Sequence, residues 1–174
     1  MSYIGSDQQM MRSVWQEHLR AEFEARDPEA ALATMSENPY VLLIPRGTAL
    51  IGKQAVRDFY VKHFIPYIPP DLELIPVSQI ISEDRIIDEL VIRFTHSLQM
   101  DWMLPGIPPT NRKVEFALVT IHQFEQDKVA SERLYWDQST VLTQLGILNL
   151  PVAGTGTGSA AKLLEIANSR MMVR

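Results

Sequence analysis

The chain has 174 residues and no cysteine, and its 16 basic and 21 acidic residues give a net charge of −5. The lack of cysteine excludes a disulfide framework, thiol catalysis and thiolate metal sites. Neither charge sign forms a long block, so we expect no nucleic acid partner and no binding to an anionic membrane surface.

The length suits one domain with a buried core. We expect that domain over residues 1–150, followed over 151–174 by a Gly-rich linker and a C-terminal helix. The N-terminal stretch is too polar for a signal peptide, and no apolar run approaches the length of a transmembrane helix. The expectation is therefore a cytoplasmic protein that does not enter a membrane.

Two helices are predicted near the N-terminus. Ser6 and Gln9 have the spacing of a capping box. An apolar stripe at helical spacing follows, formed by Met11, Trp15, Leu19 and Phe23. Asp27 and Pro28 have the residue types of a helix cap and a first helical position, so a second helix is expected to begin there.

The middle of the chain predicts strands around a third helix. The run PYVLLI at 39–44 indicates a short buried strand, and residues 53–64 indicate the helix. A proline-rich connection follows, and it leads to two further strands at 72–81 and 85–98. In the second of these strands, His96 and Phe94 are two residues apart and therefore share one face.

Two long runs rich in β-branched and aromatic residues come next. They cover 112–124 and 128–136, with a polar turn between them, and therefore predict a hairpin. A short helix is expected at 139–145, ended by Gly146. The last helix is predicted at 159–171.

Short motifs occur in a fixed order in and around this hairpin. They are the GIPPT turn at 106–110, the turn Asp127-Lys128, the aromatic pair and aspartate at 135–137, and LTQLG at 142–146. This order is similar to the SnoaL-like branch of the NTF2-like superfamily. The resemblance implies an α+β fold: a strongly bent, mostly antiparallel sheet wraps around the N-terminal helices as a cone with an internal apolar pocket.

The resemblance also implies a class of function, although this fold carries several. We expect a cofactor-independent cyclase or isomerase that uses acid/base catalysis on a small apolar polyketide- or terpenoid-like molecule. Cyclisation by epoxide opening is one route. An epoxide hydrolase in the same pocket and a non-catalytic ligand-binding module are the alternatives. A homodimer is expected in each case, because many relatives pair through the open sheet face.

Glu132 is the leading candidate for proton transfer. It shares a strand face with Leu134 and Trp136, and burial there would raise its pKa toward the working range of a general acid or base. If the opposite face is buried, Glu132 is a surface charge instead. In the related cyclases and epoxide hydrolases, a catalytic aspartate occupies the position of Leu134, so Glu132 is a substitute on the same face.

His96 and Tyr40 complete the expected catalytic set. His96 lies near the end of a central strand, where a pocket would open, and could exchange a proton near neutral pH. The alternative is a hydrogen-bonded core histidine. The superfamily often places a phenol where Tyr40 begins the first strand, and its hydroxyl could donate to a developing oxyanion. A packing tyrosine is the alternative.

The expected substrate-binding residues come from several elements. They are Tyr60, His63, Phe94, Trp102, His122, Leu134 and Trp136. Asp137 precedes an apolar helical turn and fits a helix N-cap, with a catalytic role as the alternative.

No metal or cofactor is expected. The four histidines, at 18, 63, 96 and 122, include no pair at ligand spacing, and no HExxH occurs. Neither a GxSxG nucleophile elbow nor a GxGxxG fingerprint is present.

Overall fold

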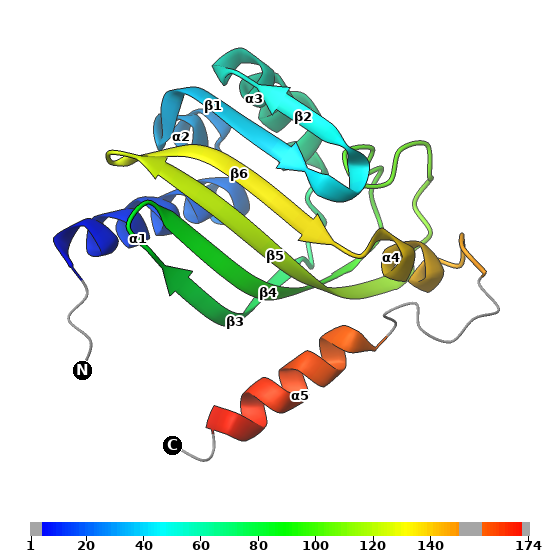
Figure 1. Ribbon diagram of the computed structural model, residues 1–174. Helices are drawn as coiled ribbons and strands as arrows, with labels where there is room; N and C mark the ends of the chain where they lie inside the picture. Colours follow the sequence, from blue (N-terminus) through cyan, green and yellow to red (C-terminus); the bar gives the residue numbers. More distant parts are fainter. Residues whose placement is uncertain (1–4, 150–157, 172–174) are drawn as a thin grey trace.

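The computed structural model describes residues 5–149 and 158–171 (Figure 1). Its helices are α1 (Ser6–Leu19), α2 (Pro28–Ala33), α3 (Lys53–Phe59), α4 (Gln138–Gln144) and α5 (Ser159–Met171). Its strands are β1 (Met35–Leu43), β2 (Thr48–Ile51), β3 (Glu73–Ile81), β4 (Arg85–Thr95), β5 (Lys113–Glu125) and β6 (Lys128–Trp136). The predicted linker falls largely on 150–157, which lie outside the described residues.

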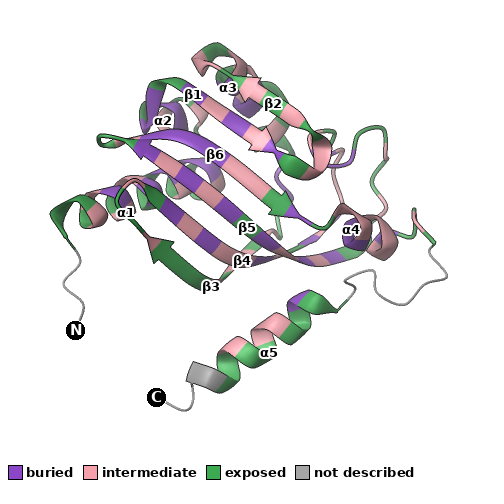
Figure 2. Cartoon of the chain, in the orientation of Figure 1, coloured by how far each residue is buried: buried purple, intermediate pink, exposed green. Residues whose placement is uncertain are grey.

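The strands form one six-stranded sheet in the order β2-β1-β6-β5-β4-β3. Neighbouring strands are antiparallel except β1 and β6, which are parallel. The sheet is bent and open, with α1, α2 and α3 packed on it (Figure 1). Buried and more exposed residues alternate along β4 and β5 (Figure 2), because successive side chains point to opposite faces. The expected α+β architecture is confirmed.

The N-terminal helices are confirmed, with a shift at the start. The cap of α1 is Gly5, whose N–H donates to the side chain of Gln8 at 3.3 Å, so the predicted box is displaced by one residue. α1 continues as a π-helical segment, Arg20–Ala25, and α3 continues in the same way as Tyr60–Phe64. The carboxylate of Asp27 accepts from two backbone N–H groups of α2, as its sequence position predicts.

The first strand is longer than predicted. β1 begins at Met35, four residues before the proline from which the sequence run was expected to start. Pro39 is tolerated because the pairing of β1 with β6 shifts register between Met35 and Tyr40. A proline without an N–H costs no ladder hydrogen bond at such an irregularity.

The predicted hairpin is formed by β5 and β6, and Gly146 ends α4 with a left-handed φ of 72°. β4 stops at Thr95, so His96 lies just beyond the strand. The segment that follows contributes to the core, because Met100, Met103 and Leu104 are buried in it. The proline-rich connection contains one 3-10 turn, Ile65–Tyr67.

The terminal helix α5 is confirmed and contacts β5 and β3. Within 5–149 and 158–171, no helix is both long enough and apolar enough to cross a membrane.

Candidate active site

A cavity of about 80 Å³ lies between the N-terminal helices and the sheet. Its walls are mostly aliphatic and aromatic, and its polar lining side chains are Glu22, Tyr60, Thr120, His122 and Glu132. The two π-helical segments each supply part of this wall: the first carries Glu22 and the second carries Tyr60. Such wide helical turns occur frequently at functional sites.

Glu132 is at the centre of a buried polar cluster. It lies in β6 between Val41 of β1 and His122 of β5, and only 5% of it is exposed. The hydroxyl of Tyr60 donates to its Oε1 at 2.7 Å. Nε2 of His18, which reaches in from α1, lies 3.4 Å from the same oxygen and 3.2 Å from Oε1 of Glu22.

The orientation of the His18 ring follows from its second nitrogen. The hydroxyl of Thr34 donates to the carbonyl of Ala31 at 2.7 Å, so its oxygen is left to accept a hydrogen bond from Nδ1 of His18, also at 2.7 Å. Nδ1 therefore carries a proton. Nε2 then faces two carboxylates, an arrangement that stabilises a second proton on the ring and makes His18 an imidazolium.

The charges within the cluster are unequal. Burial alone would lower the pKa of His18, but the facing carboxylates of Glu22 and Glu132 outweigh it and raise that pKa to about 10. Burial would raise the pKa of Glu132, yet His18, His122 and the Tyr60 hydroxyl lower it to about 2. Burial raises the pKa of Glu22 in spite of His18, because Glu132 adds a second negative charge. The His18 imidazolium thus pairs with the Glu132 carboxylate, while the pKa of Glu22 lies above its usual value because of burial.

The pKa of Glu132 corrects an expectation from the sequence. Burial was expected to raise this pKa, and burial does act in that direction. The sequence did not reveal that His18 would stand opposite, and an opposite charge within about 4 Å favours the ionised form. Glu132 is therefore a carboxylate in the resting site.

His122 connects this cluster to a second buried acid. Its Nε2 is 2.7 Å from the Thr120 hydroxyl and 3.9 Å from Oδ2 of Asp88. Its Nδ1 is 3.9 Å from Oε2 of Glu132 and has no hydrogen-bond partner among the described residues. Burial lowers the pKa of His122 to about 3, so the ring is neutral. It packs on Trp15, with ring centroids 3.6 Å apart.

The structure brings five of the predicted site residues to the cavity: Tyr60, Trp102, His122, Glu132 and Leu134. Glu132 and Leu134 share the inner face of β6, so the alternative that Glu132 is a surface charge does not hold. The remaining five, Tyr40, His63, Phe94, His96 and Trp136, do not line this cavity.

Tyr40 was expected to point into the cavity, but it lies on the opposite face of β1. Val41 and Leu43 line the cavity, and because side chains alternate along a strand, Tyr40 between β1 positions 39 and 41 points to the other face. Tyr40 is half-buried there. The phenol in the cavity comes instead from Tyr60, which is 1% exposed.

His96 is a hydrogen-bonded core residue. Its Nδ1 accepts from the backbone N–H of Thr110 at 3.3 Å, which ties the end of β4 to the GIPPT turn. Burial lowers its pKa. Phe94 packs edge to face on Phe116 in the core, and Trp136 donates its Nε1 hydrogen to Gln138. His63 is exposed on the second π-helical segment.

Sequence reasoning missed His18 and Glu22. A signal was present, because Met11, Trp15, His18 and Glu22 follow one another at spacings of four, three and four residues on one helix face. The apolar stripe was instead continued through Leu19 and Phe23, which left the two polar residues unassigned. Asp88 was not predicted as a site residue either; it is buried and accepts a hydrogen bond from Nε1 of Trp15 at 2.7 Å.

The donor atoms of His18, Glu22 and Glu132 lie within 4.8 Å of one another. One imidazole and two carboxylates are of the types that bind a divalent cation. No metal was expected because no two histidines have ligand spacing; in α1 and its π-helical continuation the potential ligands are instead one histidine and one glutamate, a helical turn apart. In this structure the same atoms are hydrogen-bonded to one another and to Tyr60, which satisfies them as a proton-sharing cluster.

Comparison with known proteins gives a family and a set of similar folds. A family model described as SnoaL-like polyketide cyclase matches residues 8–145. No curated protein matches the chain. A protein from Jannaschia sp. CCS1, provisionally assigned as a SnoaL-like polyketide cyclase, has a solved structure with a TM-score of 0.67 and 16% identity. The match covers 86% of this chain and 100% of that one.

Two further solved structures are similar. A phenazine biosynthesis-related protein, PhzB2, from Pseudomonas aeruginosa has a TM-score of 0.65 and 14% identity, covering 86% of this chain and 93% of that one. IdmH from Streptomyces antibioticus, provisionally assigned as a polyketide cyclase, has a TM-score of 0.57 and 20% identity, covering 78% and 98%. At these identities the structures establish the fold only.

Proposed function

Because the chain belongs to the SnoaL-like polyketide cyclase family, we propose that it is a cofactor-independent enzyme that cyclises or isomerises a small, largely apolar molecule by proton transfer. The observation that carries this proposal is the ionised Glu132, held by His18 and Tyr60 in the wall of an otherwise apolar cavity. Charges in such a place are costly to bury, and a site that only binds apolar ligands has no use for them.

Glu132 is the proton acceptor in this scheme. A carboxylate with a pKa of about 2 is a weak base in the resting site. The Tyr60 hydroxyl that donates to Glu132 lines the same cavity and can turn to a substrate oxygen. When it does so, Glu132 loses a stabilising hydrogen bond and becomes more basic, while the substrate oxygen gains a donor for its developing charge.

The other groups hold or return protons. His18 keeps a positive charge behind the wall, which stabilises an oxyanion formed beside Glu132. Glu22 also lines the cavity, where burial raises its pKa, and it serves as the general acid. Nδ1 of His122, which has no hydrogen-bond partner among the described residues, is positioned to contact a substrate oxygen.

Substrate chemistry decides between the possible outcomes. Removal by Glu132 of a proton next to a carbonyl gives an enolate, whose carbon attacks a second carbonyl of the same molecule. The new carbon–carbon bond closes a ring as the π bond of that carbonyl breaks, and Glu22 protonates the resulting alkoxide. Removal of a hydroxyl proton, with acid supplied to an epoxide oxygen, opens the epoxide and closes an ether ring. Both need one base and one acid in a dry cavity, and an intramolecular attack gains greatly from correct orientation. A water molecule admitted to the same site would give epoxide hydrolysis.

We also propose a homodimer that acts in the cytoplasm. Val119 and Tyr135 are cross-strand partners on β5 and β6, and each is 37% exposed, which supports an interface on the open sheet face. Light scattering should give twice the monomer mass, and Tyr135→Glu should give the monomer mass if this face is the interface.

Proton abstraction can be tested without the natural substrate. The probe is 4-phenyl-2-butanone in deuterium oxide, with exchange of the protons next to its carbonyl followed by NMR. The wild type should accelerate exchange, and Glu132→Gln should lose about 100-fold or more of that acceleration. Glu125→Gln, in the same hairpin but exposed, is the matched control and should behave as wild type. Equal exchange rates for the wild type and Glu132→Gln would show that Glu132 is not the proton acceptor.

A further inference from the structure

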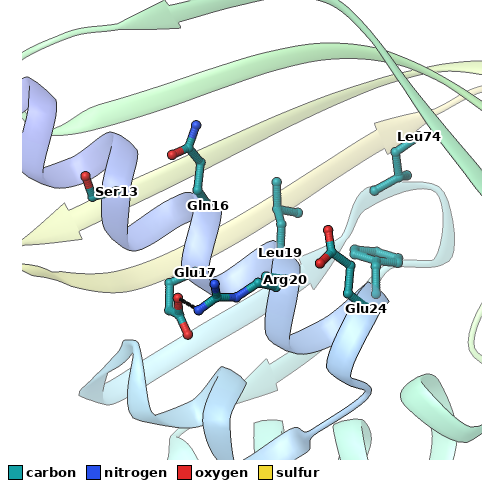
Figure 3. A pocket seen from close by; sticks show the side chains of 8 residues that line it. Ser13, Gln16, Glu17, Leu19, Arg20, Glu24 and Leu74 are labelled. Carbon is teal, nitrogen blue, oxygen red and sulfur yellow. Dashed lines mark hydrogen bonds and ion pairs between the residues drawn. The ribbon is translucent and has the colours of Figure 1, made fainter.

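A groove on the outside of the molecule shares a wall with the cavity. It lies between β3 and α1 with its π-helical continuation, and has a volume of about 550 Å³ (Figure 3). Its lining residues are Ser13, Gln16, Glu17, Leu19, Arg20, Phe23, Glu24 and Leu74. Three of these, Leu19, Phe23 and Leu74, also line the buried cavity. We call these three residues the partition.

The cavity alone is too small for a polyketide-like molecule. Its volume is about 80 Å³. Pockets that bind small molecules usually measure roughly 300–1,000 Å³. The groove falls within that range on its own. A substrate of ordinary size that reaches Glu132 therefore has to extend beyond the cavity.

The partition is a part of the wall that can open. Leu19, Phe23 and Leu74 are half-buried, and their side chains are apolar, so their movement breaks no hydrogen bond. Leu74 projects from its strand toward the helix that carries Leu19 (Figure 3). Phe23 belongs to the π-helical segment and touches Phe64 edge to face. Rotamer changes of such side chains are fast compared with catalysis.

The groove differs from the cavity in chemistry. Beyond the partition the groove is lined by polar residues. Its charged groups are the guanidinium of Arg20 and the carboxylates of Glu17 and Glu24, so one negative charge is in excess. Arg20 is already paired with Glu17, as the dashed line in Figure 3 marks. A carboxylate or phosphate would therefore meet net repulsion there. Hydroxyl or amide groups can bond to the amide of Gln16 and to the carboxylate of Glu24.

From this geometry we infer the substrate class: an amphiphile that passes the partition with an apolar, reacting end in the cavity and an uncharged, hydroxylated tail in the groove. This rests on the proposed function, because it takes Glu132 as the reacting centre. It adds the route of entry, between α1 and β3, and a specificity for the tail that the cavity itself does not provide.

Binding of 6-phenyl-1-hexanol tests the inference by NMR. Leucine methyl signals of Leu118 and Leu134 report on the cavity, and the side-chain amide of Gln16 reports on the groove. Both sets should shift with one dissociation constant. Gln16→Ala should weaken binding about fivefold through a lost hydrogen bond, whereas Gln9→Ala, exposed on the same helix, should not. The anionic analogue 6-phenylhexanoate should bind more weakly than the alcohol.

Closing the partition provides a second test. Leu74→Trp should weaken binding of the alcohol about tenfold or more, and Leu74→Ala should speed its association. The inference would be overturned if the cavity methyl signals shift without a shift at Gln16. It would also be overturned if Gln16→Ala and both Leu74 variants bind the alcohol as the wild type does. Binding does not depend on proton transfer. If the alcohol spans the partition but the protein does not accelerate deuterium exchange, the proposed function is refuted. The binding mode across the partition is then kept, without Glu132 as a reacting centre.

Discussion

Oε1 of Glu132 in β6 lies 3.4 Å from Nε2 of His18 in α1. Neither group is accessible to solvent, since His18 is 0% and Glu132 5% exposed. Helix and sheet are thus joined by an ion pair at the cavity wall. Removing one partner of such a pair leaves an unpaired buried charge, which is far more costly than the loss of a surface ion pair. The pair therefore couples the packing of α1 to the protonation of the site.

Tyr60→Phe removes the hydroxyl that donates to Glu132 and keeps the ring. We expect deuterium exchange of 4-phenyl-2-butanone to fall about 10- to 100-fold, because the donor for the developing oxyanion is lost. The free energy of unfolding should fall by about 2 kcal/mol, since a hydrogen bond to a charged group contributes roughly 1.5–3 kcal/mol. Tyr40→Phe is the matched control, because Tyr40 lies on the other sheet face. A larger loss in Tyr40→Phe than in Tyr60→Phe would reverse this assignment.

The pH dependence of stability should reveal the imidazolium. The pKa of His18 is raised from 6.5 to about 10, so its contribution is fully present below pH 6.5 and lost as the pH rises through 10. Denaturant midpoints of the wild type should therefore decrease from pH 6.5 to pH 10. In the double variant Glu22→Gln/Glu132→Gln no carboxylate faces the ring, and this decrease should vanish. The same decrease in both proteins would show that another group causes it.

Asp137 should act as a helix cap and not as a catalyst. Its carboxylate accepts from the backbone N–H of Ser139 at 2.9 Å and of Thr140 at 3.3 Å. Asp137→Ala should lower the free energy of unfolding by about 1 kcal/mol, and Asp137→Asn, which can also cap, by about 0.5 kcal/mol or less. Deuterium exchange should stay within about twofold of wild type in both. Loss of exchange in a stably folded Asp137→Asn would instead favour the catalytic alternative.

Chelation should leave proton transfer intact. The positive charge that holds Glu132 ionised comes from His18, so the proposed chemistry needs no cation at His18, Glu22 and Glu132. Dialysis against EDTA should not change the exchange rate. Added Zn²⁺ should inhibit if it binds, because it would occupy the oxygens that accept protons. A rate that disappears on chelation and returns with a divalent cation would assign these residues to a metal centre.

The sequence was most informative where local pattern decides structure. The β5–β6 hairpin, the Asp27 and Asp137 caps and the end of α4 at Gly146 all follow from turn chemistry and strand composition, and all are present. The motif order around the hairpin also pointed to the fold, which the family match supports. These features depend on residues close together in sequence.

The site was only partly accessible from the sequence because it depends on long-range placement. Glu132 could be assigned to a strand face, but its pKa depends on His18, which tertiary packing brings opposite. The prediction for Tyr40 was wrong because the sequence does not show which face of β1 the helices cover. Tyr60 came closer to its role because the third helix has a clear inner face, although its contact with Glu132 joins residues 72 positions apart.

The most direct measurement is the protonation state of the histidines by nitrogen NMR near neutral pH, with ¹⁵N-labelled histidine and His18→Gln to assign the signals. We expect both ring nitrogens of His18 to carry protons and His122 to be neutral, in keeping with pKa values of about 10 and about 3. A neutral His18 would contradict the proposed site, because Glu132 would then lack the charge that keeps it ionised in the cavity wall.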